Sequence, residues 1–140
     1  MLHLTFITVG DLPKGPFREI GDKFKKQLLA YVKMDHKVLK DESKIIDAIP
    51  AGDYVVVLDE RGQLATSHQA ANILKMIEDR GEHVTVILGG AKGLSAETKN
   101  TAKLRLSLSP MTTTHDLAHI FFLEQLYRVF TIIKGKEYHY

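Results

Sequence analysis

The sequence VILGGAKGLS, residues 86–95, passes from an apolar segment directly into a glycine turn. Its aliphatic residues are typical of a strand that is buried on both faces of a parallel sheet. Gly89 and Gly90 then let the backbone pass close to a ligand or to another part of the chain. The glycine spacing matches neither G-x-G-x-x-G nor the P-loop, which disfavours a bound pyrophosphate or triphosphate. The alternative interpretation is that these glycines only form a tight strand-to-helix turn and bind no ligand.

Strand and helix patterns alternate on both sides of this turn. Strands are predicted at residues 2–9, 38–39, 54–58, 84–88 and 104–109. Helices are predicted at residues 17–31, 41–49, 66–77, 95–105 and 115–133. We expect Thr66 and Gln69 to form a capping box, Thr113 and Asp116 to cap the last helix, and Gly135 to end it. The alternation predicts an α/β fold, with a mostly parallel sheet and helices on both faces, in a single domain over residues 1–140.

Ligands of such folds bind outside the carboxyl ends of the parallel strands. This rule selects the turn after Leu58, the turn at Gly89 and the segment after Leu108. The last of these, LSLSPMTTTHD at residues 106–116, is rich in hydroxyl groups and contains a proline. Its exposed backbone groups could hold the edge of an adenine. Helix capping alone accounts for the threonine and aspartate of this segment, but not for Pro110 and Met111.

The composition limits the class of protein. The chain has 140 residues, of which 44% are hydrophobic and 26% charged, and it has no cysteine. Thiolate chemistry, disulfides and cysteine-based metal sites are therefore excluded. Neither a signal peptide nor a membrane-spanning segment is predicted, so we expect a soluble, cytoplasmic protein. The net charge of +2 is small, and the lysine-rich first third has the pattern of an ordinary solvated helix face.

Two histidine patterns suggest further chemistry. The sequence HDLAH places His115 and His119 four residues apart, the metal-ligand spacing of H-E-x-x-H, with Asp116 in the acid position. A metal-dependent hydrolase needs a third protein ligand, and the sequence indicates none. The chain ends in GKEYHY, where Tyr138 and His139 carry rings that can stack on a base.

Taken together, VVVLDERG, VILGGAKGLS, LSLSPMTTTH, LEQLYR and a closing YH resemble the ribosomal RNA large subunit methyltransferase H family, of the SPOUT class. The motifs follow the family's order over most of residues 54–140. The resemblance implies a C-terminal trefoil knot that forms a pocket for S-adenosylmethionine. It also implies a homodimer, without metal or membrane, that methylates N3 of a pseudouridine in 23S rRNA of the assembled ribosome.

The resemblance also implies site residues. The donor-binding positions are Leu58, Gly89, Leu108, Ser109, Pro110, Met111, Thr112 and Thr113. The acceptor-site positions, grouped as catalytic, are His115, Arg128, Tyr138 and His139, the last two reaching across the dimer. Methyl transfer from a sulfonium is an in-line displacement that needs no metal, so the protein must align the reactants and help remove the N3 proton.

The sequence departs from the family pattern at three places, and the departures at His119 and Tyr140 leave a different SPOUT activity open. Members usually carry arginine at the position of His119 and a basic residue at that of Tyr140, and the segment between Val38 and Asp53 is shorter here. The alternatives are another SPOUT activity on RNA, the hydrolase that would use His115 and His119, and a ribosome-binding module without catalysis.

Overall fold

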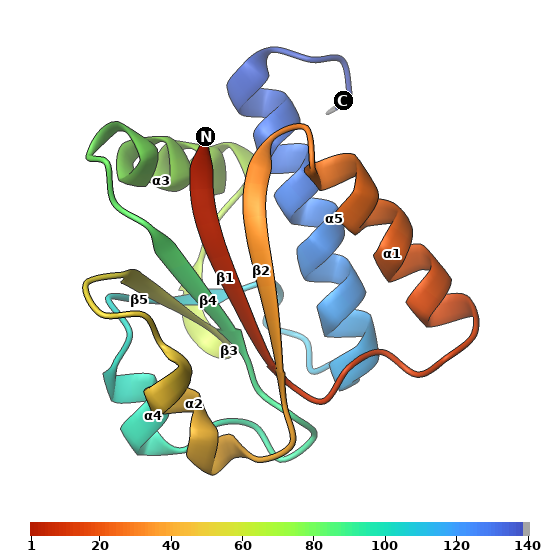
Figure 1. Ribbon diagram of the computed structural model, residues 1–140, viewed down its shortest axis with the longest axis vertical. Helices are drawn as coiled ribbons and strands as arrows, with labels where there is room; N and C mark the ends of the chain where they lie inside the picture. The colour runs from red at the N-terminus through yellow and green to blue at the C-terminus, as the bar shows by residue number, and fades with distance from the viewer. Residues whose placement is uncertain (139–140) are drawn as a thin grey trace.

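The computed structural model describes residues 1–138, so the predictions for His139 and Tyr140 lie outside the described residues. It contains a sheet in the order β2-β1-β4-β3-β5, in which every pair of neighbours is parallel (Figure 1). The strands are β1 (Leu2–Val9), β2 (Val32–Leu39), β3 (Tyr54–Leu64), β4 (Val84–Leu88) and β5 (Leu104–Ser107). The helices are α1 (Pro16–Leu28), η1 (Glu42–Lys44), α2 (Ile45–Ala48), α3 (Ser67–Asp79), α4 (Ala96–Asn100) and α5 (His115–Lys134).

Apolar cores lie on both faces of the sheet. In β1, Leu4 and Phe6 belong to the larger core, which receives residues of α3 and α5, while Ile7 belongs to the smaller core with Ile45 of α2. Neighbouring strand residues point to opposite faces, so one strand contributes to both cores. The predicted α/β fold with helices on both faces is confirmed. The trefoil knot stays a prediction.

The boundaries of several elements differ from the predictions. Helix α1 ends at Leu28 instead of Tyr31, strand β3 continues to Leu64 instead of ending at Leu58, and strand β5 ends at Ser107 instead of Ser109. Strand β2 begins at Val32 instead of Val38, because it is an edge strand whose polar residues hide the β pattern. Helix α4 ends at Asn100 instead of about Arg105, because Lys103 N–H already donates to Val55 O as the chain joins the sheet. Helix α5 is capped by Thr114 and not by Thr113, since Thr114 Oγ1 accepts from Leu117 N–H.

Other local predictions are confirmed. Thr66 and Gln69 form the capping box of α3, and Gly135 ends α5 in the left-handed conformation, with φ of 67°. The short helical segment before Pro50 is present as η1 and α2. No helix within residues 1–138 has the length and apolar character that crossing a membrane requires.

Candidate functional site

A cavity of about 430 Å³ lies at the carboxyl ends of β3, β4 and β5, beside the first turns of α5. Its size falls in the range of small-molecule sites. The cavity brings together the three places that the strand-end rule selected. Of the eight predicted donor-binding residues, those that line it are Leu58, Gly89, Leu108, Ser109, Met111, Thr112 and Thr113. Pro110 is not among the lining residues, although both of its neighbours are.

The first wall of the cavity is an outward loop within β3. Both Leu58 and Gln63 pair with Leu106 of β5, so the residues between them leave the sheet. The carboxylate of Asp59 in this loop accepts from Arg61 N–H at 3.0 Å and lies 3.5 Å from Lys99 Nζ. These contacts hold the Asp59 carboxylate at the cavity, and Glu60 lines the cavity beside it.

The second wall is the glycine turn after β4. Gly90 and Gly93 form an isolated antiparallel bridge, which folds the turn back on itself. A Cβ atom at Gly89 would lie 2.8 Å from Leu94 Cγ and 3.0 Å from the carbonyl carbon of Gly93. The turn therefore requires glycine at position 89, a residue that lines the cavity.

The third wall is the segment between β5 and α5. Met111 N–H donates to Ser109 Oγ at 3.1 Å, which shapes a turn around Pro110. Met111 itself is 78% exposed at the rim. An apolar side chain in that position is available to cover a bound ligand or to contact another molecule.

His115 connects the second and third walls. Its Nδ1 donates to Gly89 O at 2.8 Å, while its Nε2 is buried and makes no hydrogen bond within the described part of the chain. His115 therefore lies in the wall of the cavity, at the start of α5. His119, one turn later, is fully buried and does not line the cavity.

The metal-dependent hydrolase is not favoured by this geometry. The ring centroids of His115 and His119 are 6.3 Å apart, and one His115 nitrogen is engaged by Gly89 O. The metal-compatible cluster found within residues 1–138 joins His119 to Asp11 and His36 instead of to His115. It lies outside the lining of the cavity.

Arg128 lies about 20 Å along α5 from His115 at the usual rise per residue, and Tyr138 lies beyond the end of this helix. Arg128 Nη2 donates to Glu124 Oε1 at 2.6 Å, and its guanidinium lies 4.8 Å from the centre of the Tyr138 ring. Tyr138 OH also donates to Glu124 Oε1, at 3.2 Å. Burial and the Glu124 carboxylate raise the pKa of Tyr138. Within one chain, these residues do not reach the cavity.

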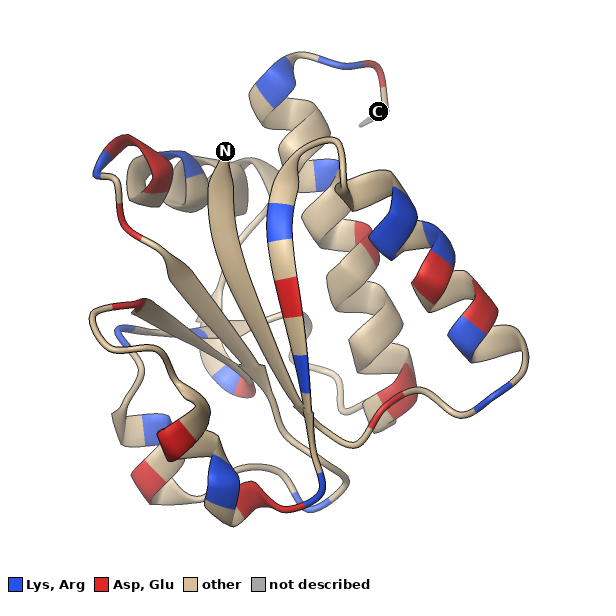
Figure 2. Ribbon diagram, viewed as in Figure 1, with Lys and Arg blue, Asp and Glu red and all other residues tan. Residues whose placement is uncertain are grey.

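The surface charge is mixed in sign. Helix α1 carries Glu19 and Asp22 among its basic residues, and on β2 lysines lie on both sides of Asp35 (Figure 2). This agrees with a solvated face. Basic residues that the sequence analysis did not select lie at the cavity itself: Arg61, Lys92 and Lys99. Phe121 also lines the cavity and was missed, because helical periodicity alone does not distinguish a site residue from a core residue.

Comparison with known proteins gives consistent matches. A family model described as "Predicted SPOUT methyltransferase" matches residues 2–139. The chain is 37% identical to the ribosomal RNA large subunit methyltransferase H of Syntrophotalea carbinolica, over 99% of both chains. It is also 37% identical to the protein of that name from Maridesulfovibrio salexigens, over 100% of this chain and 99% of the relative.

A solved structure has a similar fold. It belongs to a probable methylase family protein from Haemophilus influenzae, which superposes with a TM-score of 0.61 at 11% identity. The match covers 94% of this chain and 66% of the other.

Proposed function

The chain belongs to the SPOUT methyltransferase family, and from this premise we propose that it transfers the methyl group of S-adenosylmethionine to N3 of a pseudouridine in 23S rRNA. The acceptor would be presented by the assembled ribosome in the cytoplasm. The observation that carries the proposal is that the loop within β3 and the segments after β4 and β5 line one common cavity. Relatives that match over nearly their whole length are named as methyltransferases of large-subunit ribosomal RNA.

The residues around the cavity fit S-adenosylmethionine. Aliphatic side chains of Leu58 and Leu108 suit the faces of an adenine, and the missing Cβ atom at Gly89 lets the turn that lines the cavity fold back against Leu94. Asp59 and Glu60 offer carboxylates to ribose hydroxyls or to a positive charge. When bound, the cofactor supplies an activated methyl group on a sulfonium. The chain supplies the alignment, which is the main requirement of an in-line displacement.

We propose that the complete site needs two subunits. Arg128 lies about 20 Å along α5 from His115 and about 10 Å from Phe121, the last residue of the helix that lines the cavity, and neither Arg128 nor Tyr138 lines the cavity of its own chain. A stripe on α5 is partly exposed, and it contains Leu117 and Phe121 near the cavity and Ile132 near the opposite end. A two-fold axis across the middle of this stripe would place the partner's Arg128 beside the cavity. Tyr138 would accompany it, since the two side chains are in contact.

The departure at His119 bears on the alternative SPOUT activity. His119 is buried against the sheet, so its side chain presents no contact to RNA from this position. We therefore retain the pseudouridine as the proposed acceptor. In the proposed site, Arg128 holds a phosphate and Tyr138 positions the base.

Incubation with labelled S-adenosylmethionine and ribosomes that lack the modification tests the function. We expect one labelled methyl group per 23S rRNA, and mass spectrometry should identify it as N3-methylpseudouridine. A different methylated nucleoside would support another SPOUT activity. Binding of the methyl donor without any label in rRNA would contradict the proposed substrate, and failure to bind the donor would support a binding module without catalysis.

A further inference from the structure

His119 is buried without hydrogen-bond partners. Its exposed fraction is 0%, and neither Nδ1 nor Nε2 makes a hydrogen bond within residues 1–138. A neutral imidazole carries one donor and one acceptor. Leaving both unpaired in the protein interior costs about 1–3 kcal/mol for each group, so such a residue calls for an unseen partner, either a water molecule or an ion.

Two metal-ligating residues surround this imidazole. Asp11 follows β1, His36 lies on β2 and His119 on α5, and one ligand atom of each lies within 4.8 Å of the other two. Two imidazoles and one carboxylate are a common donor set for Zn²⁺ and for other divalent transition metals. The ligands of a tetrahedral Zn²⁺ lie about 3.4 Å apart, so small side-chain movements would complete the coordination.

We propose that Asp11, His36 and His119 form a binding site for one divalent transition-metal ion, such as Zn²⁺. The ion would join the loop after β1, the edge strand β2 and the first half of α5. Asp11 and His36 are only partly buried, which gives an ion and a fourth ligand from water a path to the site. His119 is fully buried and the cluster lies outside the cavity. The ion would therefore stabilise the fold and take no part in catalysis.

The protonation states suit a metal. Burial and the nearby Lys25 lower the pKa of His36 to about 4, and burial and His36 lower the pKa of His119 to about 3. Both imidazoles are therefore neutral near pH 7, and the neutral form is the one that binds metal. No proton has to be removed from either ring before the ion enters.

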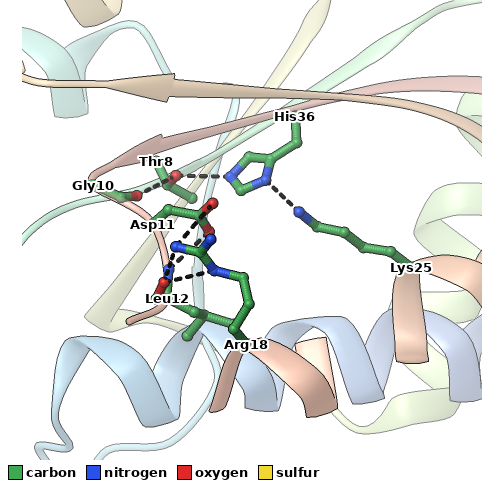
Figure 3. Close-up of polar contacts among 7 residues, drawn as sticks. All are labelled: Thr8, Gly10, Asp11, Leu12, Arg18, Lys25 and His36. Atoms are coloured by element: carbon green, nitrogen blue, oxygen red, sulfur yellow. Dashed lines mark hydrogen bonds and ion pairs between the residues drawn. The ribbon is translucent and has the colours of Figure 1, made fainter. Parts of the chain in front are cut away.

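The positively charged side chains of Lys25 and Arg18 contact the cluster and would compete with the metal ion for its ligands. Lys25 Nζ donates to His36 Nδ1 at 2.7 Å, and His36 Nε2 donates to Thr8 Oγ1 at 2.8 Å (Figure 3). Arg18 Nη2 lies 3.7 Å from Asp11 Oδ2. A metal ion that binds His36 must replace the contact with either Lys25 or Thr8. Removal of the Lys25 charge should therefore tighten metal binding, which a purely structural role for the histidines does not predict.

Titration calorimetry with Zn²⁺ on the chelator-treated full chain tests the site. We expect one ion per chain, and a Co²⁺ complex with the absorption spectrum of tetrahedral coordination. Asp11→Asn and His119→Leu should each weaken binding at least about 100-fold, whereas Lys25→Met should tighten it about tenfold. His83→Asn is the matched control, since His83 is exposed and lies outside the cluster, with its ring centroid 4.9 Å from that of His3.

The proposal is overturned if the native chain binds no Zn²⁺, if Asp11→Asn and His119→Leu bind it as tightly as the native chain, or if His83→Asn abolishes binding. Circular dichroism shows whether the leucine variant is folded. Should it fail to fold, Asp11→Asn decides, because Asp11 is partly exposed and its replacement keeps the shape of the side chain. None of these measurements depends on methyltransferase activity.

Discussion

At the residue scale, Gly89 is the most constrained position of the cavity. A Cβ atom there would lie 2.8 Å from Leu94 Cγ and 3.0 Å from a backbone carbon, closer than packed atoms tolerate. At Gly90 the nearest atom would be Val9 Cγ1 at 3.5 Å, an ordinary contact. The two adjacent glycines thus differ in what an added methyl group would meet.

We expect Gly89→Ala to weaken S-adenosylmethionine binding at least about tenfold, because the turn must shift by a distance that costs about 1–3 kcal/mol. Gly90→Ala, the matched control, should bind within about threefold of the native chain. Isothermal titration of the donor, without RNA, measures both. Equal losses in the two variants would show that the turn is sensitive to any added methyl group and not to the contact with Leu94.

The buried histidines make stability depend on pH. The folded pKa values of His36 and His119, about 4 and about 3, lie below the ordinary value of 6.5. Below pH 6.5 the unfolded chain therefore binds protons that the folded chain does not. The free energy of unfolding is fully retained above this pH and falls as the pH drops toward 4.

Replacement of His119 by leucine should remove one of these protons. We expect the slope of the unfolding free energy between pH 6 and about 4.5 to decrease by up to about 1.4 kcal/mol per pH unit. Urea denaturation at several pH values, with a chelator present, measures the slope. An unchanged slope in the leucine variant would show that His119 is not held neutral in the folded chain.

At the scale of elements, the start of α5 forms part of the cavity wall, and Thr114 fixes where this helix begins. Its Oγ1 accepts from Leu117 N–H, while Thr113 lies one residue before the cap. Thr114→Ala should therefore reduce the free energy of unfolding by about 1 kcal/mol. Thr113→Ala should change it by less than about 0.5 kcal/mol. Thermal unfolding of the two single variants compares them directly, and an equal or larger loss in Thr113→Ala would contradict the assigned cap.

At the scale of the whole molecule, a site shared between two subunits predicts complementation. Gly89→Ala impairs the donor cavity, and Arg128→Ala removes the proposed acceptor contact. A homodimer of either variant should therefore be weakly active. After co-expression, half of the dimers carry one chain of each type, and each of these has one intact shared site. We expect about a quarter of the native rRNA methylation. If co-expression gave no more rRNA methylation than either variant alone, Gly89 and Arg128 would belong to the site of one chain, and the shared site would be contradicted.

Much of the fold follows from local patterns. The buried strands, the capping box of α3 and the glycine that ends α5 are visible in the sequence, because periodicity and caps depend on near neighbours. The edge strand β2 was largely missed, since pairing with β1 and not its own composition makes it a strand. The end of α4 was wrong for the same reason, because contact with β3 ends the helix.

The sequence by itself determined the α/β class, the family resemblance and the three loops that face one another at the strand ends. These features rest on local periodicity and on the rule that parallel strands place their carboxyl ends at one edge. Only the tertiary structure decided which side chains meet. It separated Arg128 from the cavity of its own chain, and it placed His119 beside Asp11 and His36 instead of His115. Contacts between distant segments depend on how helices pack across the sheet, which spacing along the chain does not encode.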